Sequence, residues 1–137
     1  MPIDIFDRTI GLLQRSLDLR MQNQQVISAN LANLDTPGYR AVHLEFEDGL
    51  KRALGNGDPG GIKTTSPRHL PGGGEGFDQV QAKVVRVADT SGIGDHNGVN
   101  LDNEMIDMAQ NQMLYEAATQ IVGKKLALLR YVIQEGK

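Results

Sequence analysis

The residues able to do chemistry are scattered along this 137-residue chain, and no two or three of them form a recognised catalytic or ligand-binding pattern. His43, His69 and His96 stand far apart, and no pair has the helical spacing of zinc ligands. The chain has no cysteine, which excludes disulfides, thiolate catalysis and cysteine-ligated zinc. None of the four serines has a histidine at a diagnostic spacing. We therefore expect no enzymatic activity, no cofactor and no metal.

Two loops match ligand-binding motifs only in part. The glycine-rich run 72–76 lacks the lysine and the following helix of a phosphate-binding loop. The segment that starts at Asp95 begins like a calcium loop, but its sixth position is Asn100 and its twelfth is Ile106. We interpret this segment as a loop that leads into a helix, with Asp102 as the residue that caps the helix.

Charge and hydropathy exclude further classes of protein. Fourteen basic against 17 acidic residues give a net charge of −3, and no basic cluster offers a nucleic-acid footprint. No apolar run approaches the ~20 residues of a membrane span. Asp4 and Asp7 stand where a secretory signal would be basic and then apolar, so the sequence predicts a cytoplasmic protein or one exported without a cleaved signal. Aromatic residues make up only 4%, which favours a thin core over a deep enzyme pocket.

The distribution of glycine and proline along the sequence divides the chain into two regular arms and an irregular middle segment. Most of the 16 glycines and five prolines lie between residues 37 and 98, and both residues interrupt regular structure. We predict a mainly α fold in which residues 1–34 and 101–137 form one helical coiled-coil assembly domain and residues 35–100 form an irregular insert. Within the insert, apolar spacing from Phe46 to Leu54 suggests a short helix. We also expect one or two short strands there, one of them in the β-branched run 80–87.

Apolar residues recur in both arms at alternating steps of three and four, which is the heptad pattern of a coiled-coil seam. The two arms match in an antiparallel register when paired residue numbers sum to 135 or 136, which places the polar Gln24 opposite Gln112. Polar seam residues usually fix register at a cost in stability. The predicted intrachain seam consists of Ile3, Phe6, Ile10, Leu13, Leu17, Gln24, Ile27 and Leu31 in the first arm and of Met105, Met108, Gln112, Tyr115, Val122, Leu126, Leu129 and Ile133 in the second.

A second set of apolar residues recurs every seven positions on each arm, outside the seam, and we call these positions the outer rows. A single helical hairpin cannot cover both the seam and the outer rows. Either the insert folds back over the outer rows, or other chains cover them; exposed apolar stripes usually mark association surfaces, so we expect a subunit interface there. The outer rows are Ile5, Leu12, Leu19 and Val26 in the first arm and Leu114, Ile121 and Leu128 in the second.

The run from Ser28 to Arg40, SANLANLDTPGYR, resembles the signature of bacterial flagellar rod and hook proteins. Two further segments, 65–70 and 99–105, are similar to those of the proximal rod member of this family. The resemblance covers essentially the whole chain and is weaker across 55–62 and 71–95. The signature residues are Asn30, Asn33, Asp35, Thr36, Pro37, Gly38 and Tyr39.

The resemblance implies a structural subunit at the proximal end of the flagellar basal-body rod, which links the inner-membrane ring (the MS-ring) to the more distal rod and transmits torque. Its implied partners are other copies of itself, other rod subunits, the rod–ring adaptor FliE and, in transit, the flagellar type III export gate; no nucleic acid and no small-molecule substrate is implied. The implied location is the rod across the periplasmic space, reached without a cleaved signal peptide.

Rod and hook subunits also carry a Phe-x-x-x-apolar element that the export gate reads, and Phe6 and Ile10 match it. Two other functions stay open from the residues alone. The chain could be another short rod protein of the same family, or a soluble coiled-coil adaptor or export chaperone.

Overall fold

The computed structural model describes residues 3–55, 80–87 and 97–135; the side chains of residues 3–8 and 55 lie outside this description, as do segments 65–70 and 72–76, His69 and His96. The mainly α fold with two long terminal helices is confirmed, and the insert contributes one short helix and two short strands. In chain order the elements are α1 (Ile3–Ala32), β1 (Val42–Glu45), α2 (Glu47–Gly55), β2 (Lys83–Arg86) and α3 (Leu101–Glu135).

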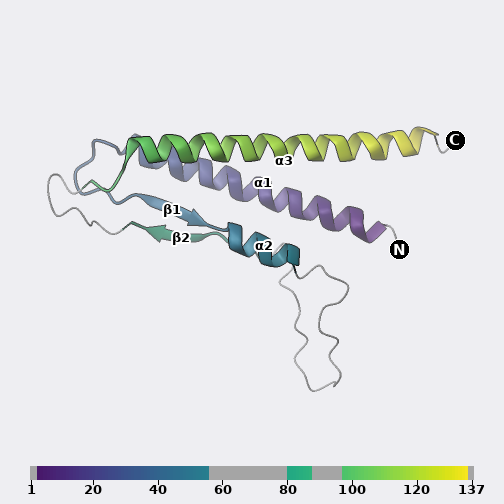
Figure 1. Cartoon of the computed structure of the whole chain (residues 1–137), viewed down its shortest axis with the longest axis horizontal. Coiled ribbons are helices and arrows are strands. Elements are labelled where there is room, and N and C mark those ends of the chain that lie inside the picture. The colour runs from purple at the N-terminus through teal and green to yellow at the C-terminus, as the bar shows by residue number, and fades with distance from the viewer. Residues whose placement is uncertain (1–2, 56–79, 88–96, 136–137) are drawn as a thin grey trace, which may run out of the picture.

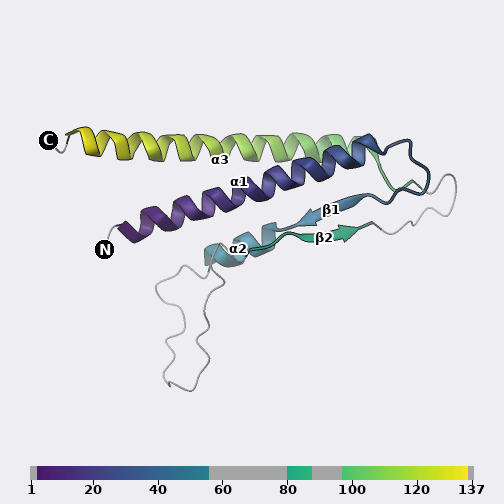
Figure 2. The ribbon, with the colours of Figure 1, turned by 180° about the vertical axis from the view of Figure 1, so that it is seen from behind.

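The two long helices lie side by side and antiparallel, and α1 is the central layer of the molecule (Figure 1). With 30 and 35 residues, α1 and α3 are about 45 and 52 Å long at ~1.5 Å per residue. Both views show α3 on one side of α1, and β1, β2 and α2 on the other (Figures 1 and 2). The helices meet where α1 ends and α3 begins, and they diverge toward the start of α1 and the end of α3 (Figure 2).

A tight turn ends the first arm and sends the chain back along α1. The amide of Tyr39 donates to the carbonyl of Thr36 at 3.2 Å, and Gly38 has a φ of +71°. Pro37 and Gly38 therefore hold the two central positions of a type II turn, in which the third residue requires a left-handed backbone that glycine adopts at little cost. A proline followed by a glycine is typical of these two positions.

The insert folds back on α1 and builds a small apolar core there. Strands β1 and β2 pair antiparallel, with His43 opposite Val85. The guanidinium of Arg15 on α1 donates from two nitrogens to the carbonyl of Val80, just before β2. The core that results contains Leu19 with Phe46, Ala53 and Val80.

This core corrects the prediction for one outer-row residue. Leu19, expected at a subunit interface, is completely buried inside the subunit. The reason is that the insert covers this face of α1, which is the alternative that the sequence left open. Leu12 and Val26, in the same row, are half-buried.

The rotation of α3 also differs from the predicted seam. Its buried residues are Glu104, Asn111 and Ala118, seven apart. Met105 and Gln112, expected to face α1, each follow a buried residue by one position and are exposed. The physical reason is that Glu104 and Asn111 find hydrogen-bond partners on α1, while small Ala118 lets the two helices approach each other.

The predicted seam residues near the end of α3 are exposed to solvent for a different reason. Because the helices diverge, Leu126 and Ile133 are 54% and 73% exposed, while Leu13 and Ile27 on α1 are buried. Intermediate burial is seen for Ile10, Leu17, Gln24, Leu31, Met108, Val122 and Leu129.

The cap of α3 lies two residues earlier than expected. The side-chain oxygen of Asn100 accepts a hydrogen bond from the amide of Asn103 at 3.1 Å, and its carbonyl accepts one from the amide of Glu104. Asn100, and not Asp102, is therefore the N-cap, a position at which asparagine and aspartate serve about equally well.

Candidate assembly interface

Asn30 lies at the point where α1, β1 and α3 meet, and it is completely buried. Its Oδ1 accepts from the amide of Val42 at 3.0 Å, while its Nδ2 donates to the carbonyl of the same residue at 2.8 Å. The hydroxyl of Tyr39 also donates to Oδ1 at 3.3 Å. The Asn30 carboxamide thus pairs with both peptide groups of Val42 as a neighbouring strand would, and it closes this edge of the ribbon.

The remaining donor of Asn30 is directed at α3. Its Nδ2 donates to Oε1 of Glu104 at 2.9 Å, and Glu104 is only 2% exposed. His43 Nε2 lies 4.0 Å from the same oxygen, and Oε2 has no hydrogen-bond partner within the described part of the chain. A buried carboxylate with an unpaired oxygen costs stability. The contact between Asn30 and Glu104 therefore has a defined geometry, but the removal of the Glu104 carboxylate from water is unfavourable.

The other signature residues finish the end of α1. The side chain of Asn33 donates to the carbonyl of Ala29 at 2.8 Å and accepts from the hydroxyl of Thr36 at 3.2 Å. Asn97, from the far side of the insert, donates from Nδ2 to the carbonyls of Asn33, Leu34 and Thr36. These contacts tie the loop before α3 to the turn that follows α1. Asp35, Pro37 and Gly38 lie at the surface around the turn.

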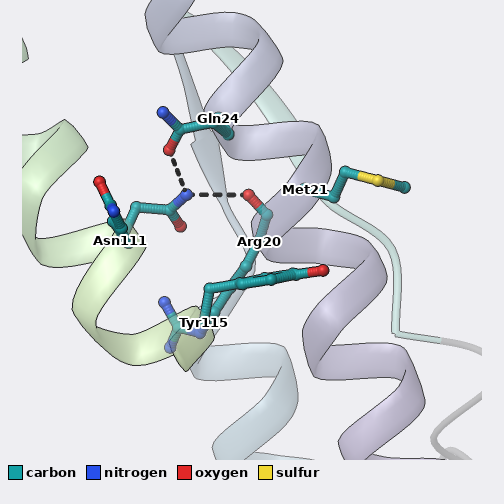
Figure 3. Close-up of a pocket in the computed structure, with 6 residues that line it drawn as sticks. Arg20, Met21, Gln24, Asn111 and Tyr115 are labelled. Atoms are coloured by element: carbon teal, nitrogen blue, oxygen red, sulfur yellow. Dashed lines mark hydrogen bonds between the residues drawn. The ribbon is translucent and has the colours of Figure 1, made fainter. Parts of the chain in front are cut away.

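A second polar contact joins the helices one heptad along. Asn111 Nδ2 donates to the carbonyl of Arg20 and to Oε1 of Gln24, each at 2.9 Å (Figure 3). Its Oδ1 accepts from Asn23 Nδ2 at 3.3 Å. Asn111 therefore takes the place opposite Gln24 that the sequence assigned to Gln112, which instead bonds Glu116 on the helix surface.

Beside this contact an open groove runs between the helices. Its first part, a hollow of about 280 Å³, is lined by Arg20, Met21 and Tyr115 among others (Figure 3). A second hollow of about 410 Å³ shares Met21 and Tyr115 and continues past Ile10 to Val122. The groove thus follows the line along which α1 and α3 separate.

Arg20, at one end of the groove, is held by the insert. Its guanidinium lies 5.8 Å from the centre of the Phe46 ring and 3.8 Å from a carboxylate oxygen of Glu47. Burial lowers the pKa of Arg20, and the Glu47 carboxylate acts in the opposite direction. The groove brings together no nucleophile and base, and among the described residues no three histidine, aspartate or glutamate side chains come together as metal ligands. No helix in the described ranges is long and apolar enough to span a membrane.

Apolar side chains are exposed over much of α3, and beyond Ala118 none of its described residues is buried. The three outer-row residues of this helix, Leu114, Ile121 and Leu128, are 43%, 48% and 60% exposed. The Ile5 and Phe6 side chains lie outside the described part of the structure. The other large apolar side chains exposed on α3 are those of Leu101, Met105, Ile106, Met113, Tyr115, Leu126, Tyr131, Val132 and Ile133.

Sequence reasoning missed the residues that hold the helices together from α3 and from the loop before it. Glu104 and Asn111 are polar residues beside apolar ones, so an apolar heptad template passes over them. Their one available signal is the spacing of seven, which matches the seven residues between Asn23 and Asn30 on α1. Nothing local in the sequence marks Asn97, whose carbonyl partners lie more than 60 positions earlier.

Comparison with known proteins identifies the class of protein to which the chain is similar. The family model described as "Flagella basal body rod protein" matches residues 14–40, which include the second half of α1 and the turn. This match points to the class of rod proteins of the flagellar basal body.

Full-length relatives define the family further. The chain is 33% identical to the flagellar basal body rod protein FlgB of Salmonella typhimurium, over 98% of this chain and 99% of that protein. It is 30% identical to FlgB of Escherichia coli (strain K12) over the same shares, and 33% identical to FlgB of Borreliella burgdorferi over 85% of this chain and 88% of that one. The chain belongs to the FlgB family of flagellar basal body rod proteins, which are structural proteins.

Proposed function

We propose that this chain is a subunit of the proximal rod, where it links the inner-membrane ring to the more distal rod and transmits torque. The observation that carries the proposal is the second half of α3, which presents apolar side chains with none of them buried inside the subunit. An apolar surface of this extent is usually covered in an assembly.

The shape of the subunit supports a load-bearing role. Two long helices run antiparallel and diverge toward one end (Figure 2), and the insert braces α1 through the Leu19 core and through Arg15. We propose that residues 1–34 and 101–137 form the assembly domain and that the insert 35–100 holds its first helix in place. The exposed row Leu114, Ile121 and Leu128, together with Leu12 and Val26, would then contact neighbouring subunits.

The proposed partners are other copies of this chain, other rod subunits, the adaptor FliE and the MS-ring. The chain would reach the periplasmic rod through the type III export gate, without a cleaved signal, and Phe6 and Ile10 would form the element that the gate reads. Ile10 is half-buried in the folded subunit, so this reading would have to precede folding.

Deletion of the gene followed by electron microscopy of basal bodies tests the proposal. We expect cells without motility, and inner-membrane rings without a rod. Complementation with Ile121→Glu, which places a charge in the exposed row, should fail to restore the rod, whereas Gln120→Glu on the neighbouring exposed position should restore it. Assembled rods in the deletion strain would show that the chain is not a required rod subunit.

A further inference from the structure

Apolar packing leaves the position of α3 on α1 under-determined. Large exposed apolar side chains occur at many positions around α3, among them Met105, Ile106, Leu114 and Ile121. A turn of about 100°, or a slide of seven residues, would still present apolar side chains to α1. Some other interaction must therefore select the observed arrangement.

Asn97 and the Gly98 amide tie the loop before α3 to the end of α1, and within the helix pair polar contacts supply the selection in two rungs. In the first rung Asn30 donates to Glu104, and in the second Asn23 and Gln24 bond Asn111. On each helix the rungs are seven residues apart, so both have the same register. We call these two rungs the polar ladder.

Only one register completes the polar ladder. If α3 moved by seven residues, about 10.5 Å at 1.5 Å per residue, Ala118 would come opposite Asn23 and Gln24. The second rung would then have no side-chain partner on α3. If α3 instead turned by one residue, Met105 and Gln112 would face α1, and the Asn30 donor would lose its carboxylate.

The ladder is costly for the fold. Of the three buried residues of α3, two are polar, and Oε2 of Glu104 has no partner among the described residues. A contact that contributed only stability would be better made by apolar side chains of similar volume. Buried polar groups in helix pairs are known to fix register at such a cost.

We propose that Glu104 and Asn111 act as specificity residues, which hold α3 in a single register on α1 and thereby set which apolar rows the subunit presents together. They select among packings that are similar in apolar burial. This inference rests on contacts within the subunit and does not depend on the rod assignment.

Cysteine crosslinking of the full chain tests the ladder, because the chain has no cysteine of its own. Met21 and Gln112 line the same hollow, so Met21→Cys with Gln112→Cys reports the native register. Met21→Cys with Thr119→Cys reports a slide of one heptad. For each cysteine pair, we compare the yield of crosslink in a protein with the intact ladder and in a protein that also carries Glu104→Leu and Asn111→Leu. Both proteins are oxidised mildly at low protein concentration.

With both rungs removed, we expect the 21–119 crosslink to rise by ~10-fold relative to the intact ladder. The protein should stay helical with a lowered denaturation midpoint, because the α1 groups that bonded Glu104 and Asn111 lose those partners. A tenfold change corresponds to ~1.4 kcal/mol of lost preference between registers. The matched control is Gln120→Leu, which adds the same apolar side chain at an exposed position of α3 and should leave the pattern unchanged.

A transplanted ladder gives a second, positive test. Glu104→Leu, Asn111→Glu and Ala118→Asn move the ladder by one heptad along α3, and the dominant crosslink should change from 21–112 to 21–119. The proposal is overturned if the transplant keeps the 21–112 crosslink. It is also overturned if removal of both rungs leaves the pattern unchanged or unfolds the chain, because the residues would then act through stability alone.

Discussion

Replacement of Asn30 by aspartate tests the side-chain hydrogen bonds that join α1 to β1 and to α3. The change keeps the size of the side chain but removes its only donor group, which serves the Val42 carbonyl at 2.8 Å and Glu104 Oε1 at 2.9 Å. It also places a second carboxylate against Glu104, which is already buried. Each lost partner leaves a buried acceptor unpaired at a cost of ~1–3 kcal/mol, so Asn30→Asp should destabilise the subunit by about 2–6 kcal/mol. A loss of this size is a large part of the ~5–15 kcal/mol that holds a typical domain folded.

A compensating change separates this contact from general damage. In the Asn30→Asp background, Glu104→Gln lets the side chain at position 104 donate a hydrogen bond to the aspartate at position 30, and it removes one of the two facing carboxylates. The change should therefore restore about 1.5–3 kcal/mol of the free energy of unfolding. In the wild-type background, the amide carbonyl introduced by Glu104→Gln can still accept from Asn30, so the same change should have a small effect. The assay is urea unfolding of the four proteins at pH 7, followed by helical circular dichroism and analysed as a double-mutant cycle.

The control cycle pairs Asn30→Asp with Glu116→Gln, a distant surface position on the same helix as Glu104. The effects of substitutions at independent sites on the free energy of unfolding add to within ~0.5 kcal/mol, and we expect such additivity for this pair. If Glu104→Gln gives no more recovery than Glu116→Gln, the direct contact between Asn30 and Glu104 is wrong.

Three further predictions concern separate parts of the chain. Leu19→Ala removes the α1 side chain at the centre of the insert core and should cost ~3 kcal/mol in chemical denaturation; an effect below ~1 kcal/mol would show that the insert does not depend on this core. Gly38→Ala forces a side chain into a backbone with φ of +71° and should cost ~1–2 kcal/mol in thermal unfolding, whereas Gly123→Ala, inside α3 with open space around it, should be neutral or stabilising by up to ~1 kcal/mol. Phe6→Ala should lower secretion of the subunit into the medium more than Leu34→Ala does; equal secretion of the two variants would argue that Phe6 serves packing alone.

The elements of this protein follow from local patterns in its sequence. The three-and-four spacing of apolar residues predicts both long helices, because a 3.6-residue period places those residues on one face whatever lies beside it. The Pro37-Gly38 pair likewise predicts its turn, because proline fixes one backbone angle and glycine permits the other. Even the antiparallel register follows to within a residue or two, since both rungs join residues whose numbers sum to about 134.

The tertiary structure alone decides which faces of those helices are used. Leu19 and Leu114 occupy equivalent outer rows, yet one is completely buried and the other is 43% exposed. The difference is that the insert folds onto α1 and not onto α3, and no local signal in the insert specifies that choice. The rotation of α3 depends in the same way on the hydrogen bond that Glu104 accepts from Asn30, 74 positions earlier, and on the one that Asn111 donates to Gln24, 87 positions earlier. A helix with apolar side chains on many sides carries no single preferred face, so its orientation is set by partners distant in sequence and not by its own periodicity.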